Sequence, residues 1–95
     1  MKVIVIEEEN HGMIGVAKDV KSAVHFLIKD CWIGEDDSLE TVLGTWDTIS
    51  DIFGENWKNI LLNMSIDRFN CYFDGWIHFT EEEIYDIDKF IKRIK

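Results

Sequence analysis

The chain has 95 residues, of which 19 are acidic and 10 basic, giving a formal net charge of −9 at neutral pH. The acids are concentrated between residues 30 and 88, where fifteen acidic side chains accompany only two basic ones, while the last seven residues carry four bases and no acid. A negative field of this kind opposes binding to nucleic acid and to anionic membranes, and it favours a protein partner with a basic surface.

Length and composition fit a single folded domain over residues 1–95. Hydrophobic residues make up 46% of the chain, with four Trp, six Phe and two Tyr, which is ample for a core. No apolar run approaches the ~20 residues of a membrane span, and the opening apolar segment ends at Glu7. We therefore expect a cytoplasmic protein without signal peptide or membrane helix. Cys31 and Cys71 form no CxxC pair and are expected to be buried free thiols.

The N-terminal part of the chain predicts a β-hairpin. Residues 2–8 predict a strand, in which residues 3–6 form an apolar, mostly β-branched run that is typical of a central strand buried on both faces. Residues 9–12 (Glu-Asn-His-Gly) suit a tight turn, because Asn and Gly tolerate positive φ. Residues 13–17 return as a second strand, in which Gly15 indicates a bulge or a close packing contact.

A helix follows the hairpin. Asp19 is a favourable N-cap, and apolar residues recur at helical spacing up to Cys31, so that one stripe can cover a face of the sheet. Gly34 is placed to end this helix. Residues 35–38 (Glu-Asp-Asp-Ser) form an acidic loop, and residues 40–46 predict a short strand that its glycine weakens.

Residues 48–73 predict two short helical segments. Thr48 and Ser65 are favourable N-caps, and Gly54 interrupts the first segment, which continues helically over residues 55–63. Aromatic and aliphatic residues recur on one face of each segment, which indicates a buried side. Residues 74–75 (Asp-Gly) then form a turn.

The C-terminal part allows two interpretations. Residues 76–79 begin a strand. Thr80 and the three glutamates after it form a capping box, which together with the late basic residues predicts a helix over 81–94. The alternative is a strand that continues through Tyr85 and is followed by a shorter helix.

These elements predict an α+β fold in the order β-β-α-β-α-α-β, with a C-terminal helix. We expect a small, mainly antiparallel sheet that carries helices on at least one face. The order of the strands within the sheet stays open.

Among single residues, His11 is the strongest candidate for a functional role. It lies in the predicted turn with Glu9 and Asn10, and loop residues held by a rigid hairpin are common functional positions. With Glu9 beside it, His11 could support acid–base chemistry or half of a metal site. The alternative is that these residues simply suit the backbone angles of the turn.

No catalytic or metal-binding pattern stands out. The histidines and cysteines lie far apart in the chain, at His11, His25, Cys31, Cys71 and His78. None has the i, i+4 or CxxC spacing typical of zinc sites, and the acidic loop lacks the glycine-centred alternation of a calcium loop. No nucleophile or phosphate-loop motif is present either. We therefore expect a non-enzymatic protein without cofactor or metal.

The tryptophans and acids together predict a protein-binding surface. Trp57 belongs to a buried helix face, whereas Trp32 and Trp46 could each be exposed or packed in the core. Exposed Trp near acids is typical of interaction hot spots. The predicted contact surface consists of Glu35, Asp36, Asp37, Glu81, Glu82 and Glu83, with Trp32 and Trp46 as anchors.

Four segments resemble small, acidic, uncharacterised proteins of Firmicutes and their phages and prophages. These are Glu-Asn-His-Gly-Met-Ile-Gly-Val-Ala-Lys-Asp (9–19), Phe-Gly-Glu-Asn-Trp (53–57), Ser-Ile-Asp-Arg-Phe-Asn (65–70) and Glu-Glu-Glu-Ile-Tyr (81–85). The resemblance covers about residues 1–85 and brings no activity or ligand. It implies a phage accessory gene, favours a strand over 76–85, and makes the basic tail 86–95 an extension of this chain.

Three functions follow as hypotheses. The first is a non-enzymatic phage protein that binds and inhibits a host or defence protein with a basic surface, in the host cytoplasm. The second is a small-ligand binder that sequesters a nucleotide-like signal between sheet and helices. The third is a structural module that forms a homodimer through Phe26 and Trp32 on the first helix.

Overall fold

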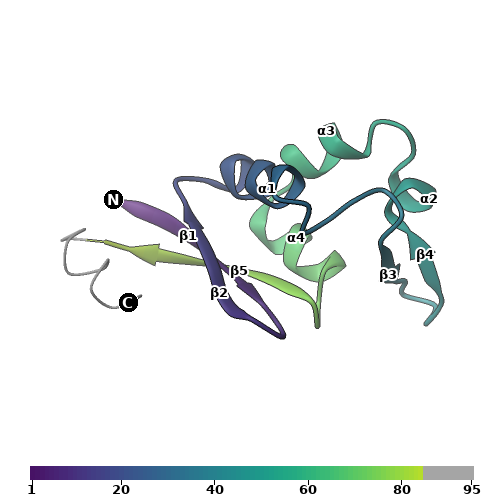
Figure 1. Cartoon of the computed structure of the whole chain (residues 1–95), viewed down its shortest axis with the longest axis horizontal. Helices are drawn as coiled ribbons and strands as arrows, with labels where there is room; N and C mark the ends of the chain where they lie inside the picture. The colour runs from purple at the N-terminus through teal and green to yellow at the C-terminus, as the bar shows by residue number, and fades with distance from the viewer. Residues whose placement is uncertain (85–95) are drawn as a thin grey trace.

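The computed structural model describes residues 1–84, which form an α+β fold of antiparallel strands and short helices (Figure 1). In chain order the elements are β1 (Lys2–Glu8), β2 (Gly12–Ala17), α1 (Val20–Lys29), β3 (Ser38–Glu40), β4 (Trp46–Thr48), α2 (Ile49–Phe53), α3 (Trp57–Leu62), α4 (Ile66–Tyr72) and β5 (Ile77–Glu83). The predicted fold class is confirmed, although the order includes β4 and one more short helix. No helix within residues 1–84 has the length and apolar character that crossing a bilayer requires.

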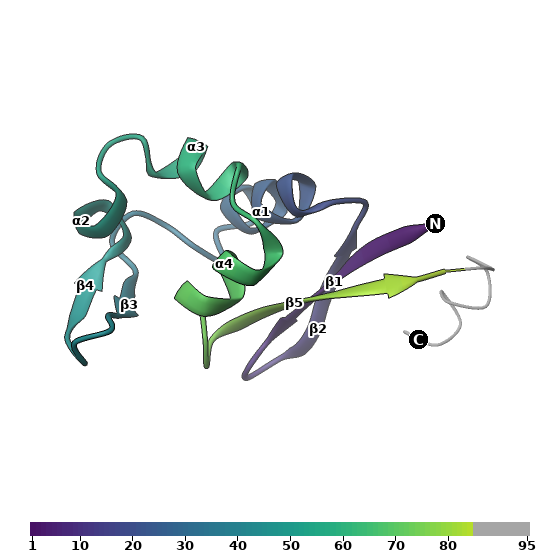
Figure 2. The ribbon, with the colours of Figure 1, turned by 180° about the vertical axis from the view of Figure 1, so that it is seen from behind.

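The main sheet has the strand order β2-β1-β5, with antiparallel pairing on both sides of β1. Ile4 and Ile6 of β1 belong to the core under the helices, whereas Val3 and Val5 lie on the opposite face. The prediction of a central strand buried on both faces is thus confirmed. Figures 1 and 2 show this sheet at one end of the molecule, the small β3–β4 sheet at the other, and the helices between them.

The β2 strand carries both features that Gly15 indicated. The register of β1 against β2 shifts between Ile6 and Glu7, which marks a bulge. A Cβ at Gly15 would lie 3.2 Å from the Phe26 ring, so that a side chain here would require the ring to shift by a few tenths of an ångström, and its absence allows α1 to pack closely on the strand.

The C-terminal strand decides between the two interpretations of the acidic run 81–83. Residues 81–83 belong to β5 and pair with the first residues of β1, so a helix beginning at 81 is wrong. Pairing with β1 provides strand hydrogen bonds that a capping box cannot outweigh. The rest of the predicted C-terminal helix lies outside the described residues.

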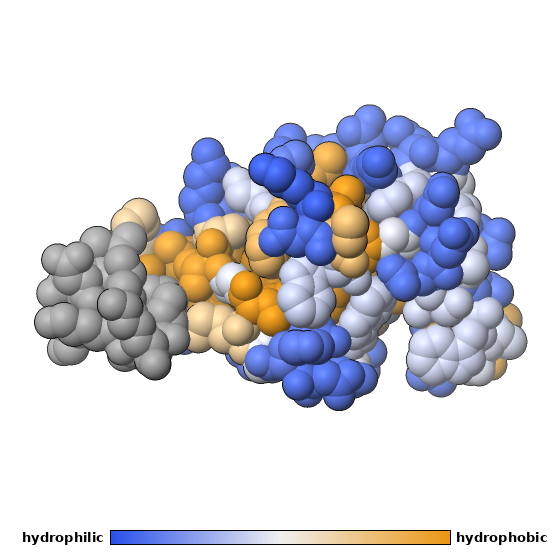
Figure 3. Space-filling model, viewed as in Figure 1, coloured by the Kyte–Doolittle hydropathy of each residue, from blue (hydrophilic) through white to orange (hydrophobic). Residues whose placement is uncertain are grey.

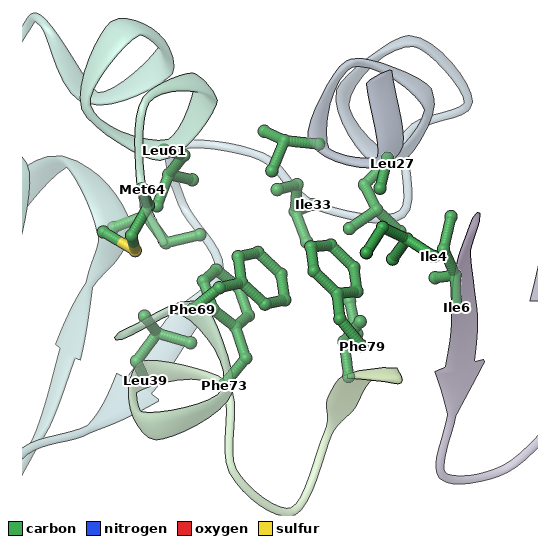
Figure 4. Packing of buried hydrophobic residues seen from close by; sticks show 14 of the residues in the cluster. Ile4, Ile6, Leu27, Ile33, Leu39, Leu61, Met64, Phe69, Phe73 and Phe79 are labelled. Carbon is green, nitrogen blue, oxygen red and sulfur yellow. The ribbon is translucent and has the colours of Figure 1, made fainter. Parts of the chain in front are cut away.

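The core contains three parallel phenylalanine rings, which come from α4, its C-cap residue and β5 (Figure 4). The Phe69 ring lies between the other two, with its centroid 4.2 Å from that of Phe73 and 3.9 Å from that of Phe79. All three side chains are fully buried. They connect α4 to the main sheet, and Leu27 and Leu61 bring α1 and α3 to the same cluster.

The first helix ends earlier than predicted, and the Cys31 thiol that follows it is exposed to solvent. Asp19 caps the start by accepting a hydrogen bond from the Ser22 N–H, at 2.7 Å, as expected. The end is at Lys29 rather than near Gly34, because Cys31 adopts a positive φ of 61° that breaks the helical path. Cys31 and Cys71 are both exposed free cysteines, so the prediction of buried thiols is wrong.

Asn70 joins α4 to the outer edge of β5 through two hydrogen bonds. Its side-chain amide donates to the Phe79 carbonyl at 2.8 Å, and its side-chain oxygen accepts from the Phe79 N–H at 2.7 Å. The amide thus satisfies the backbone groups that a neighbouring strand would bind. This side chain covers one edge of the main sheet.

Candidate functional site

The β3–β4 hairpin presents the most exposed apolar side chains of the described part of the chain. Leu43 and Trp46 are 86% and 66% exposed, and Val42 is fully exposed. We call these three residues the apolar tip. Among residues 1–84, the one other large hydrophobic side chain with such exposure is Met1, at 66%. Such a patch indicates an interaction site rather than ordinary surface.

Local chemistry fixes the tip in this position. The predicted single strand over residues 40–46 is wrong: residues 41–45 form a turn between two three-residue strands, and residues 40 and 46 are the paired ends of these strands. The Thr41 N–H donates to the Thr45 carbonyl at 2.7 Å, and the two threonine hydroxyls are 2.7 Å apart. Gly44 takes a φ of 79°, which other residues adopt with difficulty. Leu39 anchors the hairpin in the core, so the tip projects outward.

An aromatic groove of about 380 Å³ lies beside this hairpin. Its apolar wall comes from β3–β4, α4 and the turn before β5, and consists of Leu39, Trp46, Tyr72, Phe73 and Trp76. Its carboxylates are Glu9, Asp37, Glu40 and Asp74, and no Lys or Arg is among the described residues that line it. The groove therefore suits a partner side chain that is apolar along its length and positively charged at its end.

A second, acidic groove of about 670 Å³ lies between the end of α1 and α3. Ile28, Ile33 and Trp57 give it an apolar floor, and its carboxylates are Glu35, Asp36, Asp37 and Glu55. Lys58 also lines it, with its Nζ 5.6 Å from the centroid of the Trp57 ring. Lys58 thus shows that this groove can hold a cation over an aromatic ring and among carboxylates.

Asp37 lines both grooves but has a structural role. Its Oδ2 accepts a hydrogen bond from the Gly34 N–H at 2.6 Å, and its carbonyl accepts from the Ile49 N–H at 2.8 Å. It therefore holds the acidic loop against the start of α2. Glu35 and Asp36 are exposed, and although the Glu35 carbonyl accepts a hydrogen bond from the Ser50 N–H at 3.0 Å, neither carboxylate is hydrogen-bonded or ion-paired within residues 1–84. These two are therefore the loop carboxylates available to a partner.

The structure does not bring the two predicted acidic runs together. Figures 1 and 2 place the end of β5 beside the N-terminus, far along the molecule from the hairpin. There Glu83 pairs with the N-terminal amine at 3.0 Å, and Glu81 lies 3.4 Å from the Lys2 Nζ. Glu82 is half-buried on the same strand. The predicted contact surface is thus two separate regions.

The predicted turn site has a different carboxylate from the one expected. His11 Nδ1 lies 2.8 Å from an oxygen of Glu8, the one buried charged residue among residues 1–84. The same oxygen accepts the Asn10 N–H at 2.7 Å. Glu9 instead points away: its N–H donates to the Trp76 carbonyl, and its side chain lines the aromatic groove.

Trp32 packs against the turn that contains His11 and is not the exposed anchor that was predicted. Its ring meets the His11 ring edge-to-face, with centroids 5.2 Å apart, and it is half-buried against the core. Phe26 is half-buried against the same core. The predicted dimer surface through these two residues is therefore partly covered, and Trp32 lies beyond the end of α1 at Lys29.

The hydrogen bond from His11, followed by that from the Asn10 N–H, holds the pKa of Glu8 below its ordinary value of 4.5 despite burial, which raises it. A lowered folded-state pKa contributes stability above the unfolded value, and this contribution is lost as the pH falls through the folded pKa. Glu8→Gln should therefore destabilise the protein at pH 7 and lose most of this effect well below pH 4.5, as measured by urea unfolding at several pH values.

A double-mutant cycle with His11→Gln isolates this interaction. The cost of Glu8→Gln at pH 7 should shrink in the His11→Gln background, because the largest cause of the lowered pKa is then gone. Strictly additive effects would show that the two side chains act independently.

Comparison with protein-family models, curated proteins and solved structures gives no significant match for this chain. Within residues 1–84, no three His, Cys, Asp or Glu side chains are placed to hold a metal ion.

The sequence analysis did not identify Val42, Leu43, Trp76 or Glu8 as site residues. The one available signal was the Val-Leu-Gly triplet between two threonines, an apolar pair at a turn where polar residues are usual.

Proposed function

We propose that this chain is a non-enzymatic interaction protein of the phage accessory type, which binds a host or defence protein and inhibits it. The observation that carries the proposal is the exposed apolar tip beside a groove lined by aromatic residues and carboxylates. Fully exposed hydrophobic residues on a defined turn are costly to solubility unless a partner covers them. The phage origin rests on the segment resemblance alone.

The two grooves indicate how such a partner would be recognised. The apolar tip supplies contact area, with Trp46 as its largest side chain. Carboxylates around both grooves attract basic side chains, which raises the association rate and excludes acidic partners. A partner lysine or arginine would displace Lys58 from the Trp57 ring and occupy the acidic groove.

The alternative of a nucleotide-like ligand has less support. The aromatic groove offers rings on which a base could stack, but its described lining holds four carboxylates and no basic residue. Phosphate groups would be repelled there. The same surface attracts a cationic protein, which is why we favour the protein partner.

The test is capture of partners from a lysate of the native host at low and high salt. We expect one protein at near-equal amounts that is retained by the wild type at low salt and lost at high salt. The double variant Glu35→Lys, Asp36→Lys should lose it even at low salt. Retention that neither salt nor this charge reversal changes contradicts the acidic recognition mechanism.

A matched control uses the other acidic region. Glu81→Lys combined with Glu83→Lys makes the same change in net charge, at the far end of the main sheet. Surface ion pairs contribute little to stability, so this variant should fold and still capture the partner. Equal loss in both variants would mean that only total charge matters.

A further inference from the structure

The main sheet has a second buried face, which the described helices do not cover. Val3 and Val5 of β1 and Ile84, the residue after β5, form a buried cluster of their own, with exposures of 6%, 5% and 6%. The buried side chains of α1, α2, α3 and α4 all belong to the other core, on the face of Ile4 and Ile6. Within residues 1–84, no helix therefore packs over Val3 and Val5.

The neighbouring strands cannot bury this face by themselves. Val5 pairs with Val16 of β2 and with Thr80 of β5, and directly paired residues point their side chains to the same face of a sheet. Both side chains are short, so they stand beside Val5 and leave it open from above. Val16 itself is 38% exposed, and Figure 3 shows apolar surface over the part of the molecule where Figure 1 places β1 and β2. The burial of Val5 therefore requires a further layer of residues over this face.

The sequence after Ile84 is suited to form this layer. The Ile84 N–H donates to the Met1 carbonyl at 2.6 Å, so the chain leaves β5 beside the start of β1, at the edge of the cluster. Ile87, Ile91 and Ile94 then recur at spacings of four and three residues. This spacing is typical of the apolar stripe of a helix that packs on a sheet.

The dimensions of such a helix agree with those of the face. A helix over residues 85–95 is about 16 Å long, and β1 spans about 14 Å from Val3 to Glu7. With its side chains a helix is about 10–12 Å wide, and the two strands that flank β1 lie about 10 Å apart. One helix is therefore sufficient to cover the face.

The charges of the segment also fit this position. Residues 89–95 carry four bases and no acid. In a helix with 3.6 residues per turn, Lys89, Lys92 and Arg93 fall on the side opposite the isoleucine stripe. They therefore stay in water while the stripe is buried, and no charge has to be desolvated.

We propose that residues 85–95 dock as an amphipathic helix on the face formed by Val3, Val5 and Ile84. The docked helix covers this face with its isoleucines and presents its lysines and arginine as a basic surface on the side of the main sheet away from α1. The proposal goes beyond the proposed function and does not depend on it, since the apolar tip lies on the β3–β4 hairpin at the other end of the molecule.

The direct test is nuclear magnetic resonance on the full chain with labelled methyl groups. We expect nuclear Overhauser contacts from Val3 and Val5 to Ile87 or Ile91, and none from Val42 of the apolar tip to either isoleucine. If β1–β5 contacts are present but Val3 and Val5 show none to residues 85–95, the proposal is overturned. Contacts that appear only as the concentration rises would also overturn it, because they would assign the face to a second copy.

Two neighbouring variants measure the stability that docking contributes. Ile91→Ser removes an apolar side chain from the stripe and should lower the midpoint of urea unfolding by about 1 M. Lys92→Ser, on the opposite side of the helix, should shift it by less than about 0.3 M. In a Val5→Ala background the shift caused by Ile91→Ser should shrink, because the two side chains no longer meet. Equal shifts for the two serine variants, or additive effects of Val5→Ala and Ile91→Ser, contradict docking on this face.

Discussion

Replacing Phe69 by alanine should lower the free energy of unfolding by about 3–5 kcal/mol, the range for removing a buried phenylalanine. Phe69 lies between Phe73 and Phe79 in the ring stack, and all three are fully buried. Its loss opens a cavity that removes ring contacts on both sides at once. Equilibrium unfolding in urea measures the effect.

The stack also joins α4 to the main sheet. Phe69 belongs to α4, Phe73 is the C-cap residue of this helix, and Phe79 belongs to β5, which pairs with β1. We therefore expect Phe69→Ala to loosen the helices from the main sheet as well as to lower stability. Cys71→Ala, an exposed position on the same helix, is the control and should change stability by less than about 0.5 kcal/mol. A loss below about 1 kcal/mol for Phe69→Ala would place the centre of the core elsewhere.

Local patterns were sufficient to predict much of the fold. The strand predicted over residues 2–8 agrees with β1 in its bounds and in its central position, because the apolar run 3–6 is typical of a strand covered on both faces. Asp19, Thr48 and Ser65 were predicted N-caps, and each accepts the expected backbone N–H. These features depend on residues within one turn of each other.

The features that were missed depend on distant partners. Residues 81–83 have the local pattern of a helix start but become a strand because β1 lies beside them. Asn70 resembles any polar residue on a helix surface, and its role appears only when β5 lies against it. The turn of Cys31 into positive φ has no local signal at all.

The same distinction holds for the candidate site. The sequence indicated an acidic loop and an exposed Trp32 or Trp46, and the structure exposes Trp46 while half-burying Trp32. It did not indicate that Glu8 rather than Glu9 pairs with His11, since alternation along β1 decides which carboxylate faces the turn. Nor could residues so distant in sequence as Trp46 and Trp76 be expected to line one groove.

Trp46→Ala should weaken binding of the captured partner at least about thirtyfold, which corresponds to the ~2 kcal/mol loss of a hot-spot residue. Trp46 belongs to both features that carry the proposed function, because it is part of the apolar tip and also lines the aromatic groove. Being 66% exposed, it contributes little to the core, so the variant should keep the stability of the wild type.

Two variants separate the tip from the acidic field. Leu43→Ser removes an exposed apolar side chain of the same tip and should weaken binding, with a smaller loss than Trp46→Ala. Lys58→Gln removes the cation that lies over Trp57, so it should strengthen binding if a partner cation takes that place. Surface plasmon resonance measures all three, because it separates the dissociation rate, on which the tip should act, from the association rate, on which the carboxylates should act. Binding that survives both Trp46→Ala and Leu43→Ser would exclude the hairpin from the interface and leave the acidic groove as the contact.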